Sequence, residues 1–299
     1  MEARETIRAA KVLIVAGSLL LVGVVVGFIL AGEWRHTPTV VAKEAAATAA
    51  VTGLESPFTT IADQTLPAVV SIETKRSVDS ASGHPQIEGP YGDFFRRLFP
   101  ETPQEQGPRR QMKIPSSGSG FIIDKQGHVL TNNHVVRDAS EISVTLSDGR
   151  KYKAKVVGMD PSTDVAVIRI SADGPLPTVP LGDSDEIRIG DWAIAIGNAL
   201  GELDGTLTVG VVSAKGRSNL SIVGGAPSYQ NFIQTDASIN FGNSGGPLLN
   251  IRGEAIGINT AINPSGEGIG FAIPINLAKS VANQLISSGK VKPCQTLRL

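Results

Sequence analysis

Short apolar runs, each bounded by glycine, proline or polar turn residues, recur along most of the chain. Runs of this length that are rich in valine and isoleucine are typical of β-strands, whereas helices usually need longer periodic segments. A proline-containing segment at 175–180 divides the runs into two groups. The pattern therefore predicts an all-β fold with two barrels. The expected strands are 68–72, 120–123, 142–146 and 165–170 in the first group, and 192–196, 207–212, 255–258 and 270–273 in the second.

One helix is expected after the last strand. Beyond Pro274, the apolar residues Leu277, Val281 and Leu285 recur every four positions until Gly289. Proline at the start and glycine just past the end are typical helix boundary signals. The all-β fold is therefore expected to carry a short C-terminal helix.

The longest apolar stretch, residues 12–32, carries no charged residue and follows three basic ones. As a helix it could cross about 30 Å of hydrocarbon, and the basic flank predicts a cytoplasmic N-terminus with the rest of the chain outside. A cleaved signal peptide and a buried core helix are the alternatives. We interpret 1–32 as a cytoplasmic tip with a single transmembrane helix. The Ala- and Thr-rich segment 33–57 fits a flexible tether.

Composition excludes several function classes. The net charge is −1 and no basic stripe is present, so nucleic acid is not an expected partner. The single cysteine, Cys294, allows no intramolecular disulfide; it is either an incidental free thiol or a site of intermolecular pairing. No Cys/His cluster has zinc-site spacing, and no Walker-type loop is present. We therefore expect no metal and no cofactor.

A long segment, 77–117, separates the first two expected strands and is rich in glycine, proline and charge. Loops of this length are usually functional or disordered. Two interpretations stay open for it. It is either a solvated loop, or its apolar cluster packs on a neighbouring subunit or near the active site. The cluster comprises Tyr91, Phe94, Phe95, Leu98 and Phe99.

The candidate chemistry centres on Ser244, which lies among small residues in Gly242-Asn243-Ser244-Gly245-Gly246. A tight turn of this kind can expose a nucleophilic hydroxyl beside free backbone N–H groups. No histidine follows the serine, which excludes the Ser, Asp, His order of α/β-hydrolases and favours the His, Asp, Ser order of chymotrypsin-type proteases. The chain's histidines are His36, His84, His128 and His134.

His134 is the best candidate for the general base, because it lies where an apolar run meets polar residues. The other histidines fall in the tether, the long loop and an expected hairpin turn. A carboxylate must orient the base. Asp164 directly precedes an apolar run, but composition alone does not separate it from Asp160 and Asp138.

A family resemblance separates these candidates. The quoted serine turn and several further motifs resemble those of the HtrA/Deg family of serine proteases, in the same order, over about residues 60–289. This resemblance implies a chymotrypsin-like double β-barrel. It also implies His134 as base, Asp164 as orienter and Ser244 as nucleophile. The further motifs are 131–136 (TNNHVV), 162–167 (STDVAV), 231–240 (NFIQTDASIN), 257–261 (GINTA) and 268–274 (GIGFAIP).

The same resemblance assigns further residues. The backbone N–H groups of Gly242 and Ser244, with Asn243 between them, would form the oxyanion hole. Ile239 and Ile262 would line the substrate pocket. Position 238 is serine where chymotrypsin relatives that cut after Arg or Lys carry an acid. Cleavage after small or medium apolar residues is therefore expected.

Regulation and organisation are also implied by the family. Arg217 matches a residue that helps order the active site, although it could equally be an ordinary surface arginine. The resemblance places the protease domain at 58–290 and leaves a tail, 291–299, that is too short for the PDZ domain found in most members. Homotrimers are usual in the family, and we expect one here.

The function expected from these features is a membrane-anchored serine endopeptidase that degrades misfolded or damaged envelope proteins without ATP. Its catalytic domain would lie in the periplasm of a bacterium, held at the inner membrane. Two alternatives stay open. One is a dedicated stress-signalling protease that cleaves a single membrane partner, and the other is a non-catalytic, chaperone-like holdase.

Overall fold

The computed structural model describes residues 56–79, 111–199, 203–218, 220, 227–240, 242–262 and 268–292, together with Leu21 and Val26. The chain divides into two units, Met1–Glu55 and Ser56–Leu299. The expected transmembrane helix and tether, most of the 77–117 loop and Cys294 lie outside the described residues. Within the described ranges, no helix combines the length and apolar character needed to cross a membrane.

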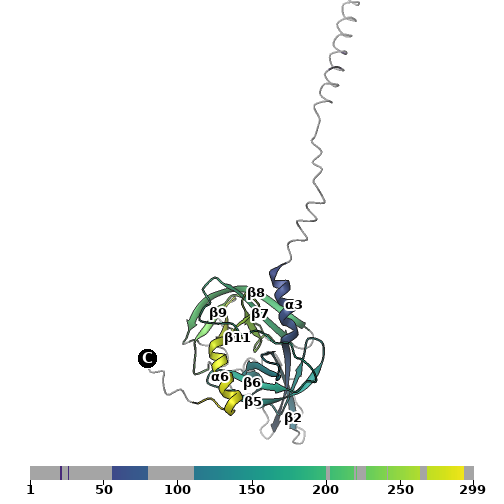
Figure 1. The fold of residues 1–299 in the computed structure, drawn as a ribbon, viewed down its shortest axis with the longest axis vertical. Helices are drawn as coiled ribbons and strands as arrows, with labels where there is room; N and C mark the ends of the chain where they lie inside the picture. The colour runs from purple at the N-terminus through teal and green to yellow at the C-terminus, as the bar shows by residue number, and fades with distance from the viewer. Residues whose placement is uncertain are drawn as a thin grey trace, which may run out of the picture. The chain divides into compact units, whose positions relative to one another are not determined.

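The first barrel is closed by six antiparallel strands in the order β1-β2-β3-β6-β5-β4 (Figure 1). Closure leaves no strand edge unpaired, and alternate side chains point inward to fill the barrel. Its strands are β1 (Val69–Asp79), β2 (Gln111–Ile122), β3 (His128–Asn132), β4 (Glu141–Thr145), β5 (Lys151–Asp160) and β6 (Val165–Ile170).

The second barrel is also closed, in the order β10-β11-β12-β9-β8-β7, and follows a connection at 171–191 that contains the expected break. The two barrels confirm the predicted all-β, chymotrypsin-like architecture. The strands are β7 (Trp192–Ala199), β8 (Leu203–Arg217), β9 (Phe232–Thr235), β10 (Pro247–Leu249), β11 (Ala255–Ile262) and β12 (Gly270–Pro274).

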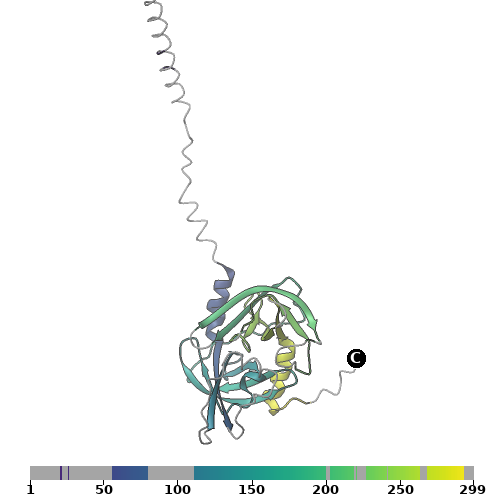
Figure 2. The same ribbon diagram turned by 180° about the vertical axis from the view of Figure 1, so that it is seen from behind.

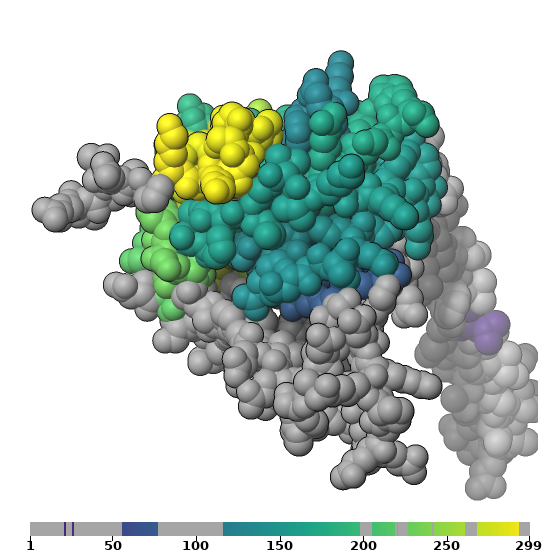
Figure 3. All heavy atoms as spheres, turned by 90° about the horizontal axis from the view of Figure 1, so that it is seen from below, coloured from purple at the N-terminus to yellow at the C-terminus, as the bar shows by residue number. Residues whose placement is uncertain are grey.

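Helix α6 (Ile275–Ser288) confirms the expected C-terminal helix. Gly289 ends it with a left-handed φ of 70°, and its N–H donates to the Leu285 carbonyl at 2.8 Å. The helix contacts β5 and β6 of the first barrel and β11 and β12 of the second (Figure 2). Its opposite side lies on the surface (Figure 3). A Cβ on Gly158 of β5 would lie 2.8 Å from a methyl carbon of Leu285, so glycine permits this close packing.

A second helix, α3 (Pro57–Thr65), is followed by the 3-10 turn η1 (Leu66–Ala68) and was not predicted. Its start follows the usual rules, because Ser56 accepts a hydrogen bond from the Phe58 N–H at 3.3 Å and Pro57 occupies the first helical position. Only Ile61 and Thr65 are buried. So few buried positions leave little periodicity for a sequence pattern to detect.

Strands β3, β5, β9 and β10 were also missed. β5 has largely exposed or half-buried side chains along its first seven residues, and β10 has only three residues, so neither forms a recognisable apolar run. The ends of the predicted 77–117 loop are strands as well, since β1 and β2 pair out to Asp79 and Gln111. These polar segments are extended because they pair with each other, and their own composition does not indicate a strand.

Candidate active site

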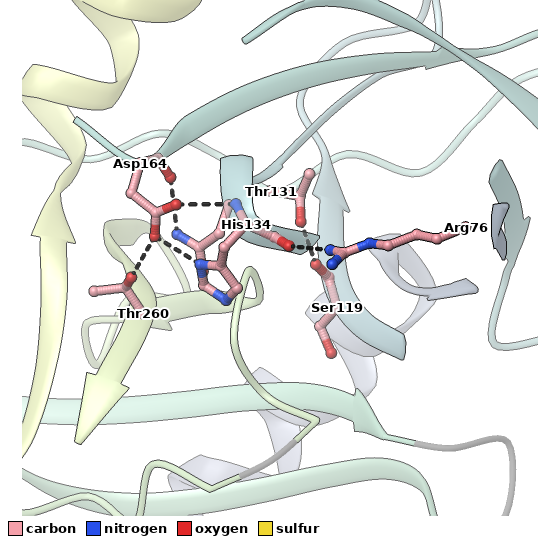
Figure 4. A network of polar contacts seen from close by, with 7 residues as sticks. Arg76, Ser119, Thr131, His134, Asp164 and Thr260 are labelled. Carbon is pink, nitrogen blue, oxygen red and sulfur yellow. Dashed lines mark hydrogen bonds and ion pairs between the residues drawn. The ribbon is translucent and has the colours of Figure 1, made fainter. Parts of the chain in front are cut away.

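His134 and Asp164 form the centre of the site. His134 lies in the one-turn helix α5 (Asn133–Val136), directly after β3, and Asp164 directly precedes β6. The His134 Nδ1 and Asp164 Oδ2 atoms are 2.8 Å apart, and the His134 backbone N–H donates to Oδ1 at 3.0 Å (Figure 4). Both carboxylate oxygens therefore bind one residue, which fixes the ring and its backbone together.

The backbone of Asp164 has a φ of 59°, in the left-handed region. Aspartate tolerates this region better than most residues. The Asp164 carbonyl accepts hydrogen bonds from the Asn133 N–H at 3.0 Å and from the Asn132 side-chain amide at 3.1 Å. Because these contacts hold the main chain, the carboxylate is directed at His134.

Thr260 of β11 donates its hydroxyl to Asp164 Oδ2 at 2.8 Å. This contact joins the second barrel to the first, and Thr260 is only 3% exposed. Sequence analysis did not single it out, although it lies inside the quoted 257–261 motif. A hydroxyl in that motif was the available signal, but no local pattern shows its partner 96 positions away.

Arg76 of β1 is a second residue that sequence analysis missed. Its guanidinium donates to the His134 carbonyl at 3.1 Å (Figure 4). Burial lowers the pKa of Arg76, and the nearby charge of Arg137 lowers it further. The arginine therefore holds the main chain of α5 on the side opposite Asp164.

The Ser244 turn packs on the first barrel. The Ser244 carbonyl accepts a hydrogen bond from the Ser119 N–H of β2 at 2.9 Å. Gly245 has a φ of 87°, and a Cβ there would lie 2.2 Å from the Ser119 carbonyl oxygen and 2.4 Å from the Thr131 hydroxyl. Only glycine fits this position. Since Thr131 belongs to β3, which leads into α5, the serine turn lies beside the segment that carries His134.

The backbone donors of the turn divide into two kinds. The N–H groups of Asn243, Gly245 and Gly246 donate to carbonyls at 2.8–3.2 Å. Those of Gly242 and Ser244 donate to no acceptor among the described residues. They are the two donors expected for an oxyanion hole. The Asn243 side chain folds back under the turn, where its amide donates to the Ser238 carbonyl at 3.0 Å.

The Ser244 hydroxyl makes no hydrogen bond within the described part of the chain. Catalytic hydrogen bonds are often long without substrate and tighten when it binds. The structure thus joins two of the three predicted catalytic residues directly and places the third in the adjoining turn.

Gly270 of β12 is a neighbour of both predicted pocket positions. A Cβ on Gly270 would lie 2.4 Å from a side-chain carbon of Ile239, and Gly270 pairs with Ile262 of β11. Ile239 is 5% exposed, whereas the side chain of Ile262 lies outside the description. Arg217 ends β8, where its Nε donates to the Gln234 side chain at 2.8 Å.

Comparison with known proteins agrees with this geometry. Residues 118–258 match the trypsin-like peptidase domain family. The DegP-like "probable periplasmic serine endoprotease" of Chlamydia muridarum is 50% identical over 247 residues, which cover 78% of this chain and 48% of that protein. The serine protease named HhoB, of Synechocystis, is 52% identical and is covered over 52% of its length. The chain thus spans about half the length of these curated relatives.

A solved structure matches over more than two thirds of both chains. A serine-to-alanine variant of the HtrA-type protease AlgW, with a decapeptide, is 43% identical with a TM-score of 0.65. The match covers 78% of this chain and 68% of that one. Its resemblance extends over both sequence and fold. The chain belongs to the HtrA family of trypsin-like serine proteases.

Proposed function

We propose that this chain is an ATP-independent serine endopeptidase with Ser244 as nucleophile, His134 as general base and Asp164 as orienter. The observation that carries the proposal is the bonded His134–Asp164 pair beside a turn whose Gly242 and Ser244 N–H groups have no acceptor among the residues that the structure describes. A positioned base beside a turn with two available amide donors suits acyl transfer.

The contacts suggest the order of events. With its Nδ1–H donated to Asp164, the imidazole keeps the lone pair on Nε2 and can accept the proton of the Ser244 hydroxyl as the oxygen attacks the scissile carbonyl. The carbonyl oxygen becomes an oxyanion that the Gly242 and Ser244 N–H groups stabilise. The imidazolium then protonates the leaving amine. Water, activated by the same base, releases the acyl group from Ser244.

Replacing Thr260 by valine should lower kcat/KM roughly 10- to 100-fold, because a hydrogen bond to a charged group contributes about 1.5–3 kcal/mol. Valine keeps the size of threonine and removes only the hydroxyl that orients the carboxylate. Hydrolysis of a chromogenic peptide measures the effect. Thr74→Val is the matched control, because Thr74 is also buried and donates to a carbonyl, that of Ser116, away from Asp164. Equal rates for Thr260→Val and wild type would contradict this role.

The proposed substrates are unfolded or misfolded proteins, cut after small or medium apolar residues. The uncharged residue at Ser238 and the packing of Ile239 against Gly270 support an apolar preference, with Ile262 on the paired strand. Such side chains are mostly buried in folded proteins, so unfolding exposes them. We further propose that Arg217 takes part in ordering the active site through the end of β8.

We also propose that residues 58–290 form the protease domain, held in the periplasm by the inner-membrane helix within 1–32 and the tether 33–57. The apolar, uncharged stretch at 12–32 supports the anchor, and the curated name of the Chlamydia relative supports the compartment. A homotrimer is the proposed assembly. Trp192 packs edge-on against Phe58 at 5.3 Å between ring centroids yet is 49% exposed, so an apolar surface is available for self-association.

Digestion of one protein in two states tests this function. The full chain, without ATP, should cleave reduced and unfolded α-lactalbumin but leave the native, calcium-loaded form intact. Mass spectrometry of the products should place the cuts after valine, alanine or isoleucine, and a fluorophosphonate probe should label Ser244. Cuts after lysine or arginine, or a requirement for ATP, would count against the proposal.

A further inference from the structure

The peptide unit between Gly242 and Asn243 is held at both ends. The Ser119 hydroxyl donates to the Gly242 carbonyl, and the Asn243 N–H donates to the Asn240 carbonyl at 3.2 Å. Gly242 has a φ of 106°, a region that glycine enters without strain and leaves as easily. A contact outside the turn is therefore needed to keep this peptide in one orientation.

The peptide unit between Ser244 and Gly245 is held in the same way. Its carbonyl accepts the Ser119 N–H at 2.9 Å, and its N–H donates to the Asn259 carbonyl at 2.8 Å. Ser119 therefore binds the peptide units on both sides of the Asn243–Ser244 unit, one through its hydroxyl and one through its main chain. The residue is fully buried.

Ser119 also connects the turn to the strand that carries the base. Its own carbonyl accepts the Thr131 hydroxyl at 2.7 Å, and Thr131 lies in β3, three positions before His134. Figure 4 shows Ser119 and Thr131 beside the His134 and Arg76 contact. One residue of the first barrel, through its side chain and its main chain, thus fixes a turn of the second barrel relative to the base.

We propose that Ser119 is a positioning residue for the oxyanion hole, an inference that rests on the proposed role of Ser244. Ser119 fixes the two flanking peptide units, and the Gly242 and Ser244 N–H groups are then the backbone donors of the turn that have no acceptor within the described residues. Its hydroxyl is buried and donates to the Gly242 carbonyl, so it acts through the turn. It keeps Gly242 from turning its peptide units to another orientation, in which the first donor would be lost.

The test compares Ser119→Ala with Ser71→Ala. Ser71 is a buried serine of the same barrel whose hydroxyl has no hydrogen-bond partner among the described residues, so its variant controls for a lost buried hydroxyl. Removing an oxyanion donor outright costs about 100- to 1,000-fold in kcat. Because Ser119 acts through such a donor, Ser119→Ala should lower kcat about 10- to 100-fold, with KM within about twofold of wild type.

A second readout separates positioning from general stability. A peptide aldehyde forms a hemiacetal with Ser244 whose oxygen occupies the oxyanion hole, so its inhibition constant should rise by the same factor as kcat falls. A merely structural role would lower the unfolding midpoint but would not raise the inhibition constant in proportion to the loss of kcat. If Ser119→Ala does not fold, Ser119→Cys fills nearly the same volume with a weaker donor and should show the same paired losses.

The outcomes distinguish the two proposals. Loss of activity in Ser244→Ala with an unchanged kcat in folded Ser119→Ala would overturn the role of Ser119 and leave the protease mechanism standing. Full activity in Ser244→Ala would overturn the mechanism itself. Equal losses in Ser119→Ala and Ser71→Ala would also overturn the inference, because packing alone would then explain both.

Discussion

Replacing Ser244 by alanine should lower kcat about 10⁶-fold, the size of loss found when the nucleophile of a serine protease is removed. No other hydroxyl can take its place in the turn, because its neighbours from Gly242 to Gly246 carry none. The residual rate would come from the amide donors and substrate binding. Peptide hydrolysis and fluorophosphonate labelling measure the two consequences, lost turnover and lost covalent capture.

His134→Ala is the companion variant, and the double variant Ser244→Ala/His134→Ala should be no slower than either single one. Residues that act as a unit are non-additive, since removing either stops the same step. Urea unfolding midpoints should stay close to wild type, because both residues are only partly buried. Additive losses, or labelling of a residue other than Ser244, would show that the nucleophile is misassigned.

Replacing Asp164 by asparagine should lower kcat about 10⁴-fold at neutral pH. The backbone N–H of His134 requires an acceptor, so the amide oxygen of the new asparagine takes the position of Oδ1. The NH₂ group of the new side chain then takes the position of Oδ2. A donor then faces Nδ1 of His134, which must accept. The proton moves to Nε2, and the ring can no longer receive the Ser244 proton.

This substitution has little structural cost, because asparagine tolerates the left-handed φ of 59° found at Asp164. Asp160→Asn is the matched control. The Asp160 carboxylate accepts the Ser162 N–H at 3.2 Å and the Thr163 hydroxyl at 2.7 Å, within its own turn. We expect near wild-type kcat for Asp160→Asn. Comparable losses in the two variants would mean that neither carboxylate has a dedicated role.

The choice among three aspartates could not be made from the residues of the sequence alone. Asp164, Asp160 and Asp138 are equivalent by composition and chain order, and only the family resemblance favoured Asp164. In the structure Asp160 closes a local turn, whereas Asp164 reaches a histidine 30 positions away. That difference follows from the pairing of β3 with β6, which aligns Asn132 with Val165. A pairing of distant strands leaves no trace in the periodicity of either one.

More of the fold than of the site could be predicted from the sequence. Buried apolar runs such as β6 are visible locally, so two barrels and α6 could be predicted. β5 and β10 could not, because the first is mostly polar and the second is very short. The contacts of Thr260, Ser119 and Arg76 join residues 96, 123 and 58 positions apart. The Arg76 contact forms only when the first barrel has closed, and the Thr260 and Ser119 contacts form only when the two barrels have docked.

The hydrogen bond between Thr260 and Asp164 affects when the site can assemble during synthesis. The residues proposed for catalysis are divided between the two halves of the chain, and the last of these contacts is supplied by β11. Most of the domain, up to and including β11, must therefore be synthesised before the Thr260–Asp164 contact can form. The proposed catalytic mechanism thus gives a nascent chain no complete active site until its two barrels have docked.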